Sequence, residues 1–267
     1  MTRFSPSTGL LTGLDQLKIE TAGPILHIRL NRPAKRNAIS DLLIQQLHTA
    51  FINLPTETKV VVLSGEGEHF CAGLDLGEVG KSGAEHGMWH SLGWHKAFDA
   101  LQFGLVPVIS VLHGAVVGGG LELASASHIR IAEASAYFAL PEGTRGLFVG
   151  GGGSVRIPRL IGVARMTDMM LTGRVYDATE AQSIGLTQYQ VADGEGLAKA
   201  LQLAERVAGN SPMSNFAIMQ ALPRIADQSM SEGMLTESLM AAISQSTDDA
   251  RDRLQAFLSK RAAKVER

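Results

Sequence analysis

A glutamate inside an apolar, glycine-led run is the first candidate for chemistry in this sequence. Glu122 stands in the run 116–123, two residues after the last of the three glycines at 118–120. Glycines have no Cβ, so the backbone there can approach a ligand closely. The run also predicts a helix start, where unpaired N–H groups carry partial positive charge. Such a place suits a developing oxyanion with a carboxylate beside it, although a glycine-rich turn with its carboxylate in water remains an alternative.

Two further segments carry groups that could join such a site. Glu142 follows a short predicted strand, and Pro141 restricts the backbone just before it. The segment 69–76 follows a buried predicted strand and has small residues at its centre. Taken singly, each segment is more often structural than functional.

Three other patterns have functional alternatives. His69 and Cys71 could form a thiol nucleophile with a base, but a small buried thiol in a tight loop accounts for them as well. His86 and His90 have a spacing found among metal ligands, whereas a solvated helix face is the simpler interpretation. Residues 77–82 look like the end of a phosphate-binding loop, but that motif requires a further glycine upstream.

The composition bounds the class of protein. The chain has 267 residues, of which 45% are hydrophobic and 19% charged, and this balance is typical of a globular protein. A net charge of −2 predicts no nucleic-acid surface. Cys71 is the single cysteine, which excludes an intrachain disulfide. Since no signal-peptide or membrane-spanning pattern is visible, we expect a cytoplasmic protein without a membrane partner.

The order of predicted elements indicates an α/β fold, because strands that look buried on both faces alternate with helices. Residues 201–267 are almost wholly helical by pattern, so we expect a core at 1–200 that holds the active site and a helical C-terminal region at 201–267. The main predicted elements are a hairpin at 17–20 and 25–30, strands at 60–63, 107–112, 129–132 and 136–139, and helices at 40–54, at 84–102 and after the triple glycine.

Together these segments resemble the crotonase family, also called the enoyl-CoA hydratase/isomerase family. The resemblance extends from about residue 15 to 262 in the family's order and spacing. It rests on a set of short motifs: Asn31-Arg32-Pro33 with Asn37-Ala38, the runs 70–76 and 118–123, Gly114, Pro141-Glu142, Gly146, the glycines 150–152, Leu171-Thr172-Gly173, Ala178, Ala181, Gly185-Leu186 and the run 256–261.

The resemblance implies a spiral of strand–strand–helix turns with a helical C-terminal region that drives trimer formation. Self-association as a homotrimer or a dimer of trimers is therefore expected. It also implies an acyl-CoA thioester as substrate, with coenzyme A as part of that substrate and with no metal or other cofactor.

In this family two backbone N–H groups hold the thioester oxygen, and matching by position gives Leu74 and Gly119. The hydratases carry two glutamates, which correspond to Glu122 and Glu142. By analogy, Glu122 activates water for attack at the β-carbon and Glu142 protonates the α-carbon. The resemblance assigns CoA and substrate binding to seven residues: Lys35, Arg36, Ala72, Asp75, Leu76, Phe257 and Lys260.

The sequence therefore predicts an enzyme that hydrates a 2-enoyl-CoA, and (methylthio)acryloyl-CoA with subsequent thioester hydrolysis is one candidate substrate. A CoA-thioester hydrolase, a double-bond isomerase with a single carboxylate, and a non-enzymatic acyl-CoA-binding protein are the alternatives. Arg145 and Val149 depart from the family pattern and leave the acyl group open. The segment 77–95, with Trp94, falls where relatives build the acyl pocket.

Overall fold

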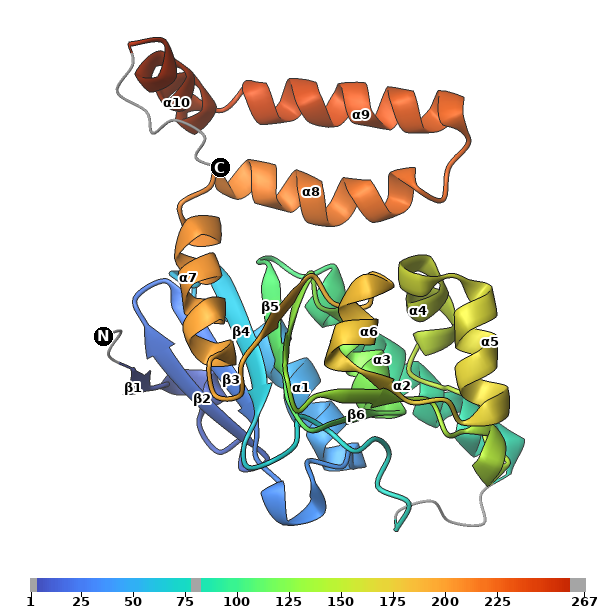
Figure 1. Ribbon diagram of the computed structural model, residues 1–267. Coiled ribbons are helices and arrows are strands. Elements are labelled where there is room, and N and C mark those ends of the chain that lie inside the picture. The colour runs from blue at the N-terminus through green and yellow to red at the C-terminus, as the bar shows by residue number, and fades with distance from the viewer. Residues whose placement is uncertain (1–3, 78–82, 260–267) are drawn as a thin grey trace. The chain divides into compact units, whose positions relative to one another are not determined.

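A seven-stranded sheet forms the centre of the fold. The computed structural model describes residues 4–77 and 83–259 (Figure 1). The first two strand pairs of this sheet are antiparallel and the others are parallel. In spatial order the strands are β1 (Ser5–Pro6), β2 (Leu17–Ala22), β3 (Ile25–Leu30), β4 (Val60–Gly65), β5 (Val108–Leu112), β7 (Ile129–Glu133) and β10 (Tyr189–Val191).

A smaller sheet lies beside the glycine run. It consists of β6 (Ala115–Val117), β8 (Tyr137–Ala139) and β9 (Tyr176–Asp177). The predicted α/β class, the hairpin and the long strands are confirmed. The sequence prediction missed β1, β6, β9 and β10, since strands of two or three residues are too short to show a period.

The parallel strands are buried on both faces, as their continuous apolar runs require. In β4, Val60 and Val62 pack in a cluster with α7 (Gly196–Ala208), which contributes Leu203. Val61 and Leu63 point to the opposite face and join the main core. Successive side chains of β4 thus point to opposite faces of the sheet, and each face packs against its own apolar layer.

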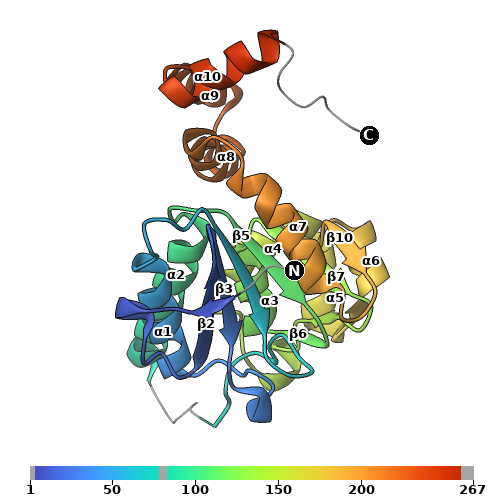
Figure 2. The same cartoon turned by 90° about the vertical axis from the view of Figure 1, so that its left-hand side faces the viewer.

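The helices α1 (Asp41–Ile52) and α2 (Ala84–Gln102) lie side by side, and α1 also contacts β2 (Figure 2). The predicted start of α1 is confirmed, because Ser40 Oγ accepts a hydrogen bond from Leu43 N at 3.1 Å. The remaining helices of the core are α3 (Gly119–Ala126), α4 (Gly153–Ile161), α5 (Val163–Thr172) and α6 (Ala178–Ser183).

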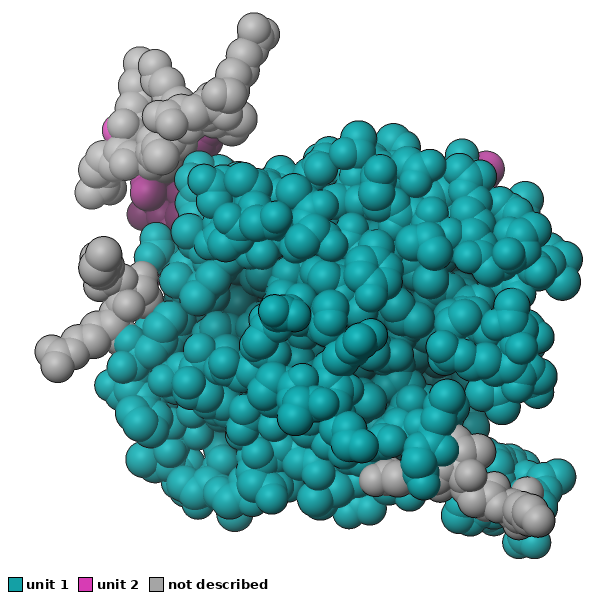
Figure 3. Space-filling view, turned by 60° about the horizontal axis from the view of Figure 1, so that its bottom comes forward, with its two compact units in different colours: residues 1–208 teal, residues 209–267 magenta. Residues whose placement is uncertain are grey.

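The chain divides into two compact units, residues 1–208 and 209–267 (Figure 3). The expected boundary near residue 200 falls inside α7, whose apolar face packs against the main sheet. The second unit consists of α8 (Pro212–Ile225), α9 (Met230–Gln245) and α10 (Asp248–Leu258). Among the described residues, no helix has the length and apolar character needed to cross a membrane.

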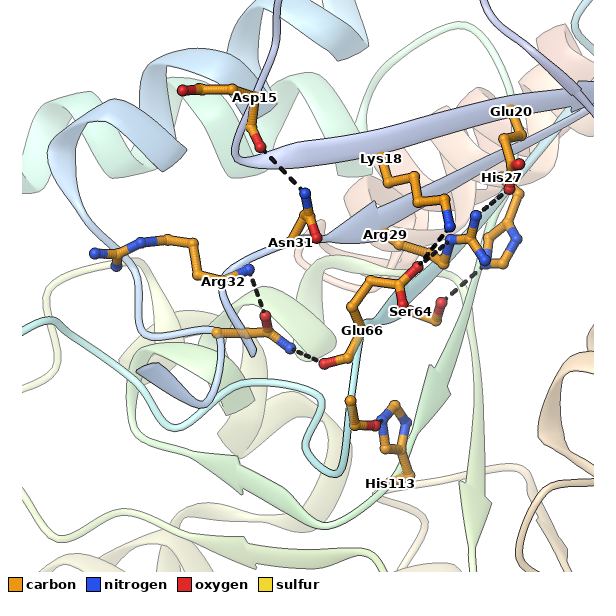
Figure 4. A network of polar contacts seen from close by, with 12 residues as sticks. Asp15, Lys18, Glu20, His27, Arg29, Asn31, Arg32, Ser64, Glu66 and His113 are labelled. Atoms are coloured by element: carbon orange, nitrogen blue, oxygen red, sulfur yellow. Dashed lines mark hydrogen bonds and ion pairs between the residues drawn. The ribbon is translucent and has the colours of Figure 1, made fainter. Parts of the chain in front are cut away.

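Asn37 connects two loops that lead to the glycine run. Its side chain is fully buried and accepts from Arg32 N at 2.8 Å. Its amide nitrogen donates to Glu66 O at 2.9 Å and to His69 O at 2.7 Å. Figure 4 shows the neighbouring ion pairs that Lys18 and Arg29 of the hairpin make with Glu66, the residue after β4. The network fixes the start of the segment that continues to Leu74.

Candidate active site

A cavity of about 320 Å³ in the first unit brings six of the predicted site residues together. These lining residues are Ala72, Leu74, Leu76, Gly119, Glu122 and Glu142. They come from three stretches that are far apart in the sequence. The alternative of a solvated turn around Glu122 is wrong, because this side chain is only 3% exposed.

The glycines at the start of α3 allow side chains to approach the backbone. Gly118 has φ of 54°, a region that favours glycine, and a Cβ there would stand 2.9 Å from Glu142 Oε1. A Cβ on Gly119 would stand 2.6 Å from Trp94 Cζ3. Both contacts are too short for a carbon atom, so this corner of the cavity requires glycine.

Two backbone N–H groups are free at this corner. Gly119 is the first residue of α3, and its N–H therefore has no partner inside the helix. Leu74 lies opposite Ile39 in an isolated parallel bridge. The backbone of Ile39 donates to Gly73 O and accepts from Asp75 N, which are the two neighbours of Leu74. The Leu74 N–H therefore faces away from Ile39. Within residues 4–77 and 83–259, neither N–H has a hydrogen-bond acceptor.

The two donors are neighbours. A Cβ on Gly119 would lie 3.5 Å from Leu74 N, and a Cβ on Gly73 would lie 3.4 Å from Gly119 N. The isolated bridge between Cys71 and Val116 joins the two segments just before these residues. The pair can therefore serve one oxygen atom, which is the geometry of an oxyanion hole.

Glu122 is held by the backbone at the start of α4. Its Oε1 accepts from Gly151 N at 2.7 Å and from Gly153 N at 2.8 Å. Burial raises the pKa of Glu122, while these two hydrogen bonds and the charge of Arg156 oppose that rise. Because both hydrogen bonds hold Oε1, the orientation of the Glu122 carboxyl group is fixed.

Glu142 follows β8 and has a different environment. It is 9% exposed, and its Oε2 is buried without a hydrogen-bond partner among the described residues. Burial raises the pKa of Glu142, and the nearby Glu122 charge raises it further, whereas Arg145 lowers it. This carboxyl group is therefore suited to hold a proton.

One face of α2 forms a wall of the cavity. His86, His90 and Trp94, spaced four residues apart, all line it, with Ser91 beside them. Trp94 is 4% exposed and packs edge-on against Phe98, with 5.6 Å between the ring centroids. His86 is exposed and His90 is partly exposed, as the interpretation of a solvated helix face predicts, and both also line the cavity. The four-residue spacing that these histidines share with Trp94 is the sequence signal for this wall.

The metal and thiol alternatives find no support in the geometry. His90 Nε2 lies 3.0 Å from Asp41 Oδ1, and no cluster of three potential metal ligands occurs in the part of the chain that is described. Cys71 is fully buried, and burial raises the pKa of its thiol to about 12. The nucleophile is the thiolate, so this buried thiol is not suited to covalent cysteine chemistry. His69 Nδ1 accepts from Ala115 N and has a structural role.

The predicted CoA-binding residues are spread more widely. Asp75 does not line the cavity, and its carboxylate accepts from Arg32 Nη2 at 2.9 Å, which lowers the pKa of Asp75. Leu76 lines the cavity. Lys35 and Arg36 are exposed at the end of a short 3₁₀ turn.

Two predicted CoA-binding residues belong to the C-terminal region of the chain. Phe257 belongs to α10 of the second unit and is 66% exposed. Lys260 lies outside the described residues, as do residues 78–82 of the phosphate-loop-like segment 77–82. The roles of these residues stay predictions.

A buried pair of carboxyl groups beside two free backbone donors defines an enzyme site that can stabilise an oxyanion and move protons. A family model described as enoyl-CoA hydratase/isomerase matches residues 20–267. The chain belongs to this family. The match confirms the predicted crotonase-family fold and the prediction of an enzyme of the enoyl-CoA hydratase type.

Individual relatives agree with this assignment. A protein from Rhizobium meliloti (strain 1021), named as a probable enoyl-CoA hydratase, is 33% identical over 93% of this chain and 97% of its own. A Rhodopseudomonas palustris CGA009 protein assigned as an enoyl-CoA hydratase has a crystal structure with a TM-score of 0.91 and 54% identity, covering 97% of this chain and all of that one. A similarly assigned protein from Thermobifida fusca YX, solved in complex with CoA, is 25% identical with a TM-score of 0.81, covering 90% and 96%.

Proposed function

We propose that the protein adds water across the α,β double bond of a 2-enoyl-CoA thioester. The observation that carries this proposal is the shared cavity of Glu122 and Glu142 beside the free N–H groups of Leu74 and Gly119. Attack of water at the β-carbon drives negative charge onto the thioester oxygen and produces an enolate. Each group in the cavity has one task in this reaction.

The backbone donors stabilise the enolate oxygen. The Leu74 and Gly119 N–H groups need no reorganisation, and the second also carries the positive partial charge of the α3 N-terminus. Loss of one such donor raises a reaction barrier by about 3–4 kcal/mol. The bulk of the Leu74 side chain does not remove its N–H, so the departure from the commoner alanine leaves the donor in place.

The two carboxyl groups divide the proton transfers. Glu122, with its charged form favoured by two N–H bonds, takes a proton from water as the oxygen attacks the β-carbon. Glu142, with its unpartnered Oε2 and raised pKa, gives a proton to the α-carbon. One proton is gained and one is lost, so proton exchange with solvent restores the pair for the next turnover.

Coenzyme A carries several negative charges, and the exposed cations Lys35 and Arg36 are suited to bind them. The CoA complex of the Thermobifida fusca relative supports a CoA ester as the ligand. Ala72 and Leu76, which line the cavity, are placed to contact the pantetheine arm. Phe257 and Lys260 extend this proposal to the C-terminal region.

The acyl group is proposed to be small. Trp94 packs against Gly119 and Gly151, and this ring therefore takes up space directly behind the donors. A short conjugated acyl group such as (methylthio)acryloyl fits this proposal, with thioester hydrolysis as a possible second step. A panel of CoA esters of increasing chain length tests it: Trp94→Ala should gain rate on longer chains relative to short ones, and unchanged chain-length preference would contradict the assignment.

Self-association is proposed through the second unit. Its helix α9 exposes Met234, Leu235 and Leu239, each more than half exposed in the single chain. Such side chains are typical of an interface between subunits. Analytical ultracentrifugation should show a trimer or a hexamer, and a monomer at micromolar concentration would contradict this part of the proposal.

The activity is tested with crotonyl-CoA. We expect the absorbance of the conjugated thioester to disappear without release of free thiol during the first phase. A CoA-thioester hydrolase, which would use the same donors and one carboxylate, would release thiol from saturated acyl-CoA as well. Migration of the double bond without addition of water would identify an isomerase. Absence of turnover with every ester of the panel would leave acyl-CoA binding as the function.

A further inference from the structure

Arg156 is a buried cation beside the cavity that has no assigned role. It lies in the second turn of α4 and is 9% exposed. Its guanidinium makes three hydrogen bonds: Nη1 donates to Gly151 O at 3.0 Å, Nη2 to Asp99 Oδ1 at 2.6 Å and Nε to Gln102 Oε1 at 2.6 Å. Asp99 and Gln102 both belong to α2. The rigid fork of an arginine can satisfy all three acceptors at once.

The same glycine joins this cation to the proposed base. The carbonyl oxygen of Gly151 accepts a hydrogen bond from Arg156 Nη1, and its N–H donates to Glu122 Oε1 at 2.7 Å. The next residue, Gly152, has φ of 91°, and a Cβ there would stand 2.2 Å from Arg156 Nη1. The loop is therefore packed between a guanidinium and a carboxyl group, with no room for a side chain.

We propose that Arg156 is a positioning residue that holds the Gly151–Gly153 backbone against Glu122 and so sets the orientation of this carboxyl group for water activation. The inference rests on the proposed function, because it assigns Glu122 the role of base. It adds a residue that does not touch the substrate, and it explains why a charged side chain lies buried at this point of α4.

The physical argument has two parts. The geometric part is that the Gly151 and Gly153 N–H groups can point at Glu122 Oε1 only while the loop is fixed, and Arg156 anchors that loop to α2. The electrostatic part is that a positive charge favours the ionised form of Glu122, and Arg156 indeed lowers the pKa of Glu122 against the effect of burial. The two parts can be separated by substitution.

Arg156→Gln removes both the charge and the fork, whereas Arg156→Lys keeps the charge. We expect kcat of Arg156→Gln to fall by about 10- to 100-fold, as for small misplacements of catalytic groups, with KM changed much less. The acidic limb of its kcat/KM profile should move to higher pH, because a base of higher pKa ionises later. Arg156→Lys should keep the limb nearer to wild type and recover part of kcat.

Asp99→Ala tests the geometric part alone. The Asp99 side chain is 56% exposed, so the fold should tolerate its loss, and Arg156 keeps its own charge. We expect a smaller fall in kcat without an upward shift of the acidic limb. Arg159→Gln is the matched control, because Arg159 is an exposed arginine of the same helix and donates to Val155 O within α4; its kinetics should match wild type.

The outcomes distinguish this inference from the proposed function. Circular dichroism first establishes that each variant is folded. If Arg156→Gln does not fold, the kinetics of Asp99→Ala test the inference instead. If the folded Arg156 and Asp99 variants keep wild-type kcat and pH profile while Glu122→Gln is inactive, the inference is overturned and the function stands. If Glu122→Gln is also fully active, the proposed function itself fails.

Discussion

The two glutamates of the cavity have contrasting surroundings. Glu122 lies in a helix, with one oxygen bound by two N–H groups from a glycine loop. Glu142 lies after a short strand, with one buried oxygen that has no partner among the described residues. Burial raises the pKa of both; hydrogen bonds from the glycine loop oppose this rise at Glu122, whereas at Glu142 the charge of Glu122 adds to it.

This difference teaches how one cavity can supply a base and an acid. A carboxyl group whose ionised form accepts N–H hydrogen bonds is held in place and is able to accept a proton. A carboxyl group with a free buried oxygen retains a proton until a substrate atom approaches it. Since the two groups interact, they should titrate as a coupled pair.

The largest effect is expected from Glu122→Gln and Glu142→Gln, which keep the size of each side chain and remove its proton chemistry. Each should lower kcat for crotonyl-CoA hydration by about 10²–10⁴-fold, as for loss of a general acid or base. Steady-state kinetics with a folding check measures this. Near-normal turnover of both variants would show that the chemistry lies elsewhere.

Alanine substitution of two glycines should disturb the glutamates one at a time. In Gly153→Ala the new Cβ would stand 2.6 Å from Glu122 Cγ, and in Gly118→Ala it would stand 2.9 Å from Glu142 Oε1. Displacement of a catalytic group by about 1 Å can cost about 10²-fold in rate. We expect kcat losses of that order in both variants.

Gly93→Ala provides the control for these two substitutions. It lies in α2, and a Cβ there would meet nothing within 4 Å. Its kinetics should be unchanged, and its thermal stability should stay equal or rise slightly because alanine favours a helix over glycine. Equal losses in all three variants would mean that general disturbance, not displacement of the glutamates, accounts for the effect.

The coupling of the pair predicts a pKa change. Removing the charge of Glu122 in Glu122→Gln should lower the pKa of Glu142, because the repulsion that raises it is gone. Titration of the side-chain carboxyl by ¹³C NMR measures this shift. An unchanged pKa of Glu142 would contradict the electrostatic contact between the two groups.

The smallest effect concerns stability. A carboxyl group whose pKa is raised on folding binds more protons in the folded state, so stability falls as pH rises through the interval between its unfolded and folded pKa values. A one-unit difference in pKa corresponds to about 1.4 kcal/mol. Glu142→Gln should therefore raise Tm more at pH 8 than at pH 4, and thermal unfolding at both pH values checks this. An equal change at both pH values would indicate that the pKa of Glu142 is not raised by folding.

Much of the fold and the two glutamates could be predicted from the sequence. Long apolar runs such as β4 and the glycine run before Glu122 carry clear local signals. The short strands β6 and β9 carry none, and the boundary of the helical tail was placed within α7 because helical periodicity alone does not show which helix packs on the sheet.

The remaining parts of the site depend on contacts between distant segments. The meeting of Leu74 with Gly119 depends on the bridge from Cys71 to Val116, which only the folded chain creates. A local pattern cannot show that the Asp75 side chain pairs with Arg32, which lies in a distant loop. The anchoring of Gly151 by Arg156 joins α2 to α4 and is likewise invisible in the sequence.

A crystal structure of the protein with acetoacetyl-CoA, whose enolised form resembles the proposed intermediate, tests the central claim most directly. We predict the thioester oxygen at about 2.7–3.1 Å from both Leu74 N and Gly119 N, with Glu122 facing the β-carbon and Glu142 facing the α-carbon. A thioester oxygen bound away from these two amides, or carboxyl groups that do not reach the acyl carbons, would contradict it.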